Sequence, residues 1–211
     1  MKRAGDSKDI VRRGYDHASS TYRADQEDEK CQKYHVWIDR VLPLIPDGSH
    51  VLDLGCGCGI PVAKRLSATH SVTGIDISPV QIERARKLVP NATFICADMA
   101  TVDFPNNSFA AILAFYALFH LPLREQPQLF RNVHRWMVPG GYFMAMVGRL
   151  PGTRTVKGWL NIPGLKMYFS HADLMTYESW LREAEFEIID VTMVEDVDDA
   201  LPLILARTKD R

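Results

Sequence analysis

The sequence predicts an α/β domain with three layers, in which helices cover both faces of a mostly parallel sheet and an antiparallel hairpin completes one edge. Short apolar segments alternate with helical segments between residues 50 and 147, which is typical of parallel strands joined by helical crossovers. One segment, 109–116, is apolar throughout, as strands buried on both faces are. Two more apolar segments, 186–194 and 200–208, lie close together near the end, and we expect a sheet of seven strands.

The individual elements are predicted from apolar spacing and from residues that begin or end helices. Ser78, Pro79 and Gln81 favour a helix start, with Ser78 as N-cap, Pro79 at the first helical position and Gln81 closing a capping box. Residues 149–170 contain Gly, Pro and aromatic residues, and we expect an inserted loop or cap there. The short acidic segment "EDVDD" at 195–199 is expected to form the turn of the terminal hairpin. Strands are expected at 50–54, 72–75, 93–96, 109–116, 141–147, 186–194 and 200–208, and helices at 7–20, 27–42, 61–68, from 79 onward, 125–137 and 171–184.

Length and composition indicate one globular domain with a substantial core. The chain has 211 residues, of which 46% are hydrophobic and 24% charged, and the net charge is −1. A clear basic excess, the usual mark of a nucleic-acid binder, is missing. The basic start is not followed by an apolar signal core, and no apolar run approaches the roughly 20 residues needed to span a bilayer. The four cysteines do not indicate a disulfide framework, so we expect a soluble cytoplasmic protein, monomeric or homodimeric.

A glycine-rich segment, "VLDLGCGCGIP" at residues 51–61, follows the first predicted strand. Ligands of open parallel sheets bind beyond the carboxyl ends of the strands, and glycines allow the backbone to approach a ligand closely. A dinucleotide-binding loop has the pattern G-x-G-x-x-G, whereas here the third glycine position is Ile60. The carboxylate of Asp53, just before the loop, suits a ligand with an ammonium group better than a pyrophosphate.

Two further acids end the next two predicted strands. Asp76 is placed to accept hydrogen bonds from both hydroxyls of a ribose, and Asp98 from the exocyclic amine of adenine. Ile77 and Met99 follow these acids and could enclose the base. Taken singly, each acid could instead cap a helix or face solvent in a loop. An amino acid end, a ribose and an adenine together describe S-adenosylmethionine.

The sequence resembles the class I S-adenosylmethionine-dependent methyltransferases that act on small molecules. The resemblance covers about residues 48–147, and it implies a Rossmann-like fold. A tyrosine of the N-terminal segment "YDHASSTY" would then contact the cofactor, which implicates Tyr15 or Tyr22. The family usually has an acid where this chain has Ala110. The matching stretches are "VLDLGCGCG", "VTGIDISPVQIERAR", "ATFICADM", "FPNNSFAAILAFYALFHL" and "VPGGYFMAM".

The resemblance also implies how one domain is divided and which residues hold the cofactor. We expect an N-terminal helical cover at 1–46, a cofactor-binding core at 47–147, a substrate cap at 148–170, and a C-terminal helix and hairpin at 171–211. The residues expected to bind S-adenosylmethionine are Tyr22, Asp53, Gly55, Cys56, Gly57, Asp76, Ile77, Asp98, Met99 and Phe115.

The acceptor is expected near the end of the fourth predicted strand. His120 is the best candidate for a general base because imidazole titrates near neutral pH, although it could equally be a structural histidine bonded to the backbone. Tyr116 could position an acceptor oxygen or pack under the cap. The motifs of amine methylation on adenine and of cytosine C5 methylation are missing, which disfavours nucleic-acid substrates. Cys56 and Cys58 lack further ligands for a metal, and no metal is expected.

The cap is expected to form the wall of a pocket for an apolar small molecule. Its aromatic residues, Trp159 and Tyr168 among them, could alternatively pack the cap onto the sheet or form an oligomer surface. The residues expected to bind substrate are Tyr15, Tyr116, His120, Trp159 and Tyr168.

The sequence thus favours a methyltransferase that acts on a small, rather apolar metabolite, with O-methylation preferred. One alternative is a relative that binds the cofactor without transferring methyl, and another is a nicotinamide-dependent oxidoreductase. Ile60 and Asp53 count against the oxidoreductase.

Overall fold

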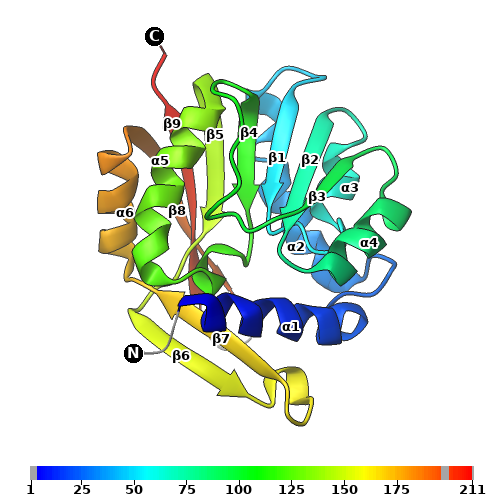
Figure 1. Cartoon of the computed structure of the whole chain (residues 1–211). Helices are drawn as coiled ribbons and strands as arrows, with labels where there is room; N and C mark the ends of the chain where they lie inside the picture. The colour runs from blue at the N-terminus through cyan, green and yellow to red at the C-terminus, as the bar shows by residue number, and fades with distance from the viewer. Residues whose placement is uncertain (1–3, 196–199, 211) are drawn as a thin grey trace.

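The computed structural model describes residues 4–195 and 200–210 and shows a seven-stranded sheet between two layers of helices (Figure 1). The strand order is β3-β2-β1-β4-β5-β9-β8, in which the first five strands are parallel to one another and β9 is antiparallel to both of its neighbours, β5 and β8. This confirms the predicted fold class. The strands are β1 (His50–Leu54), β2 (Ser71–Asp76), β3 (Thr93–Cys96), β4 (Phe109–Ala114), β5 (Met137–Met146), β8 (Phe186–Glu195) and β9 (Ala200–Thr208).

The core consists of two apolar clusters, one on each face of the sheet, because the central strands are buried on both sides. One cluster packs the sheet against the helices α2, α3 and α4, and the other packs it against α5 and α6. The helices on these faces are α2 (Gln32–Ile38), α3 (Val62–Leu66), α4 (Pro79–Leu88), α5 (Gln126–Trp136) and α6 (Leu174–Glu183). Short 3-10 turns are η1 (Glu29–Cys31), η2 (Leu42–Leu44), η3 (Leu118–His120), η4 (Leu123–Glu125) and η5 (Trp159–Asn161).

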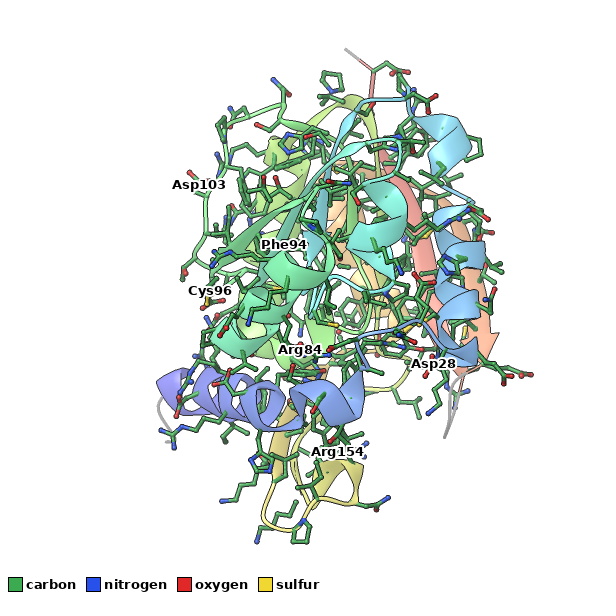
Figure 2. The ribbon with its side chains drawn as sticks, turned by 90° about the vertical axis from the view of Figure 1, so that its right-hand side faces the viewer. Asp28, Arg84, Phe94, Cys96, Asp103 and Arg154 are labelled. Carbon is green, nitrogen blue, oxygen red and sulfur yellow. The ribbon has the colours of Figure 1, made fainter. Side chains whose placement is uncertain are left out.

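Two further elements lie beyond the carboxyl ends of the parallel strands. Helix α1 (Ala4–Tyr22) crosses this edge, and the hairpin of β6 (Gly152–Lys157) and β7 (Lys166–His171) lies on its far side (Figure 1). Figure 2 shows the same order from the side, with Arg84 of α4 facing α1 and Arg154 on the hairpin beyond it. A hydrogen bond of 2.6 Å from Arg84 to Ser19 joins α4 to α1.

The structure differs from the sequence prediction in several local details. The predicted helix at 27–42 is shorter and lies between the 3-10 turns η1 and η2, since Pro43 cannot continue a helix. The expected loop at 149–170 contains the β6–β7 hairpin. Ser78 caps α4 by accepting a hydrogen bond from the Gln81 backbone at 3.1 Å, but the Gln81 side chain accepts one from Ser19 and does not complete a capping box. The predicted acidic turn falls mostly on 196–199, outside the described residues.

Candidate active site

The glycine loop after β1 is shaped by two close approaches. Gly55 has a φ of 76°, and a Cβ atom there would lie 2.4 Å from the Cβ of Ala117, so the loop packs directly on the segment that leads to His120. Gly57 has a φ of 54°, and its backbone N–H donates a hydrogen bond of 2.9 Å to Oδ2 of Asp76. The loop therefore holds the carboxylate that ends the neighbouring strand.

Asp76 and Asp98 occupy the strand ends that the sequence predicted. Asp76 also accepts a hydrogen bond of 2.8 Å from the Ser78 backbone, and Asp98 accepts one of 2.9 Å from the Ala100 backbone. Burial raises the pKa of Asp76 to about 6, although the backbone N–H groups of Ser78 and Gly57 oppose that rise. Both acids thus make local hydrogen bonds while still facing a common cavity.

An open cavity of about 690 Å³ lies between the strand ends, α1 and the turn η3. It contains Gly55, Gly57, Asp76, Ile77, Asp98, Met99 and Phe115 of the predicted cofactor set, together with Tyr22 from α1. We call Gly55, Gly57, Asp76 and Asp98 the cofactor side. Because glycine backbone, two carboxylates and flanking apolar side chains meet in one space, these residues fit an amino acid, a ribose and an adenine ring.

The other wall of the cavity carries His120 and Tyr15. The hydroxyl of Tyr15 lies 2.9 Å from Nε2 of His120, and Nδ1 of His120 lies 2.8 Å from the carbonyl oxygen of Tyr168. A carbonyl can only accept, so Nδ1 carries the proton and Nε2 accepts from Tyr15. The arrangement therefore presents an unprotonated nitrogen toward the cavity.

His120 and Tyr15 are both neutral in this environment. Burial lowers the pKa of His120 to about 4, against the opposing effect of its hydrogen bond to Tyr168. Burial also raises the pKa of the Tyr15 hydroxyl well above its usual range. A buried pair without net charge is compatible with the apolar surroundings of the cavity.

Aromatic side chains from three elements surround this pair. The ring of Trp159, in the hairpin, lies 5.2 Å from that of Tyr15 and 5.7 Å from that of Tyr22. The ring of Phe169 lies 4.9 Å from the imidazole of His120. Gly14 allows β7 to approach α1, since a Cβ there would lie 2.6 Å from the Cε of Met167. We call Tyr15, His120, Trp159 and Tyr168 the acceptor side.

Some of the predicted site residues lie behind the cavity wall. The cavity is lined by Tyr15, Tyr116 and His120, whereas Trp159 covers the tyrosines from outside and Tyr168 contributes its carbonyl to His120. Asp53 of β1 and Cys56 of the glycine loop are buried, and they are not among the described lining residues.

Asp53 is an unusual buried acid. Its side chain is almost fully buried, and Oδ2 has no hydrogen-bond partner among the described residues. Burial, with repulsion from Asp76, raises the pKa of Asp53 to about 8. Its carboxyl group is therefore largely protonated at neutral pH in the free protein, which does not favour a direct ion pair with the ammonium group of a ligand.

Lys8, which was not among the residues predicted from the sequence, also lines the cavity. Its ammonium group lies 2.6 Å from Oδ2 of Asp98 and also pairs with Glu125. Lys8, Val11, Tyr15 and Tyr22 recur at helical spacing, so they share the face of α1 that looks into the cavity. The helical spacing from Tyr15 and Tyr22 is therefore the sequence signal that could have indicated Lys8.

Among the residues described, no three His, Cys, Asp or Glu side chains form a group that could hold a metal ion. Within 4–195 and 200–210, no helix is long and apolar enough to cross a membrane.

Comparisons with known proteins agree with this geometry. Residues 51–141 match the family model described as "Methyltransferase domain". Phosphoethanolamine N-methyltransferase 1 of Arabidopsis thaliana is 30% identical over 78% of this chain and 33% of its own length. The sterol 24-C-methyltransferase erg6 of Aspergillus fumigatus is 35% identical over 47% of this chain and 28% of its own length. The chain thus spans about a third of these relatives.

The solved structures show the same fold. The 1,6-didemethyltoxoflavin-N1-methyltransferase of Burkholderia thailandensis, solved with S-adenosylhomocysteine, has a TM-score of 0.75 at 19% identity, over 100% of this chain and 92% of its own. The [4+2]-cyclase SpnF has a TM-score of 0.72 at 22% identity, over 97% of both chains. These likenesses define the fold as Rossmann-like, the fold of the methyltransferases in this group. More specifically, residues 51–141 match a methyltransferase domain, and the comparisons support S-adenosylmethionine as the cofactor.

Proposed function

We propose that this protein transfers the methyl group of S-adenosylmethionine to a hydroxyl group of a small, rather apolar molecule. The observation that carries the proposal is the unprotonated Nε2 of His120, which accepts a hydrogen bond from a phenol, that of Tyr15, at 2.9 Å beside the cofactor side. A substrate hydroxyl that replaced the Tyr15 hydroxyl as hydrogen-bond donor to Nε2 would be oriented for attack on the methyl group. The aromatic walls support an apolar acceptor.

The cofactor would be held by the cofactor side and by the aromatic residues of α1. Asp76 would accept from the ribose hydroxyls, Asp98 from the adenine amine, and the backbone of Gly55 and Gly57 would adjoin the amino acid end. When bound, S-adenosylmethionine supplies a methyl group on positive sulfur, and the carbon–sulfur bond breaks toward sulfur as the acceptor oxygen attacks. The ends of β1, β2 and β3 fix these groups before any ligand arrives.

His120 would accept the proton that the acceptor hydroxyl loses. As the new oxygen–carbon bond forms, the oxygen gains positive charge and its proton becomes strongly acidic. A base with a pKa of about 4 is then sufficient, and it is neutral throughout the physiological pH range. Tyr15, Tyr22 and Trp159 would exclude water from the reacting atoms.

The relatives support methyl transfer but differ in acceptor, since their names specify nitrogen in one and carbon in another. The methyltransferase domain match decides against a nicotinamide-dependent oxidoreductase. The alternative of cofactor binding without methyl transfer is kept as an outcome of the test, because the [4+2]-cyclase SpnF shares the fold.

The test has two stages. Calorimetry should detect S-adenosylmethionine binding and no binding of a nicotinamide dinucleotide. The protein with methyl-labelled cofactor is then given matched pairs of aromatic alcohols and aromatic amines, and a metabolite extract. Labelled ethers support the proposal. Labelled amines alone would refute the O-methylation, and cofactor binding without any labelled product would refute methyl transfer.

A further inference from the structure

Gln126, the first residue of α5, has a fully buried side chain beside the turn that carries His120. Its Nε2 donates hydrogen bonds to the carbonyl oxygens of Leu121 and Ser170, each at 2.8 Å, and to that of Leu118 at 3.2 Å. In the sequence, Leu118 and Leu121 lie on either side of His120. One amide group thus joins η3 to strand β7.

The two segments that Gln126 joins are also the two that fix the imidazole. His120 lies in η3, and the carbonyl of Tyr168 that accepts its Nδ1 proton lies in β7, two residues before Ser170. The distance between η3 and β7 therefore determines whether the hydrogen bond from Nδ1 can form. Ser170 also joins β7 to the next turn, η4, since its hydroxyl accepts from the Leu123 backbone at 3.2 Å.

The chemistry of the junction requires a neutral donor of this length. Three carbonyl oxygens converge on one nitrogen, so a carboxylate at position 126 would bring like partial charges together. An apolar side chain of the same length would leave buried carbonyls with fewer donors, which costs free energy. The side chain is therefore suited to donating hydrogen bonds to this junction.

We propose that Gln126 is a positioning residue for His120, acting by holding η3 against β7 so that Nδ1 bonds to Tyr168 and Nε2 faces the acceptor. The inference rests on the proposed role of His120 as the base. Gln126 is not among the described residues that line the cavity, so it acts on His120 through the backbone.

Nitrogen NMR of the histidine side chains tests this without relying on turnover. In the wild type, His120 should be the Nδ1–H tautomer and should resist protonation down to about pH 4. In Gln126→Met, a wider gap should admit water, so His120 should show mixed tautomers and a pKa closer to the ordinary value. The rate of methyl transfer should fall about tenfold to a hundredfold, and the acid limb of its pH profile should move to higher pH. Cofactor affinity should stay within about twofold.

The matched control is Gln128→Met, the same substitution on the exposed face of the same helix, which should leave all readouts unchanged. Should Gln126→Met fail to fold by circular dichroism, Gln126→Asn keeps the amide but shortens it, and should give the same changes. Wild-type tautomer and titration in the folded variant would overturn the inference. If the wild type transfers no methyl, the NMR result still decides the positioning role, so the two failures are distinguishable.

Discussion

The cofactor side and the acceptor side of the cavity are held in place over very different distances along the chain. Asp76 is fixed by hydrogen bonds to Gly57 and Ser78, which lie 19 and 2 residues away. The hydrogen bonds of His120 reach Tyr15 and Tyr168, which lie 105 and 48 residues away. The cofactor side therefore belongs to a local strand–loop–strand unit, whereas the acceptor side depends on how α1 and the hairpin dock. The ion pair between Lys8 of α1 and Asp98 connects this docked helix to the cofactor side.

The largest effect on cofactor binding is expected from Gly57→Val, which breaks the cofactor side alone. A Cβ atom at Gly57 meets only Gln81, at 3.9 Å, so a branched side chain would project into the cavity, and φ of 54° is unfavourable for valine. We expect cofactor affinity to fall at least about a hundredfold by calorimetry. Gly48→Val is the control, because Gly48 has a similar φ of 78° with open space around it and does not line the cavity. Equal cofactor affinity in the two variants would mean that the glycine loop does not adjoin the cofactor.

His120→Ala tests the acceptor side alone. Loss of the base should lower the maximal rate by about 10²–10⁴-fold while leaving cofactor affinity within about twofold. Rapid-mixing kinetics and calorimetry on the same preparation separate the two quantities. An unchanged maximal rate would leave this histidine a structural residue bonded to the β7 backbone.

Asp76→Ala should weaken cofactor binding by about 1–3 kcal/mol, because the ribose hydroxyls would lose their acceptor. The rate with saturating cofactor should change little, which distinguishes this variant from His120→Ala. A calorimetric titration of Asp76→Ala beside Asp47→Ala, an exposed acid far from the cavity, provides the comparison. Wild-type affinity would exclude Asp76 from the cofactor contacts.

The pH dependence of stability should also differ between the two buried groups Asp53 and His120. The folded-state pKa of Asp53, about 8, lies above the ordinary value, so the folded protein binds more protons and loses stability as pH rises from about 4 to 8. The folded-state pKa of His120, about 4, lies below its ordinary value, so it contributes stability that is lost as pH falls from about 6.5 to 4.

The wild type should lose free energy of unfolding between pH 5 and pH 8, and Asp53→Asn should reduce that loss by at least about 1 kcal/mol. Urea denaturation of the ligand-free protein at the two pH values measures this difference. A wild-type pH dependence in the variant would mean that Asp53 ionises normally in the folded state.

The sheet and the cofactor side could be predicted because their signals are local. Continuous apolar segments gave the strands, and the glycines and acids at strand ends gave the ligand positions, since the carboxyl ends of parallel strands meet at one edge. The departures were also local in origin: Phe115 and Tyr116 leave the predicted fourth strand, and Tyr116 has a φ of 56°.

By itself, the sequence determined the α/β layers, the glycine loop and the acids Asp76 and Asp98, because period and spacing act between neighbours in the chain. The tertiary structure decided that the cap is a hairpin, that Lys8 reaches Asp98, and that Gln126 joins the His120 turn to β7. The Gln126–Ser170 and Lys8–Asp98 contacts join residues that are 44 and 90 positions apart, and their geometry depends on helix and hairpin docking, for which no single stretch of sequence carries a signal.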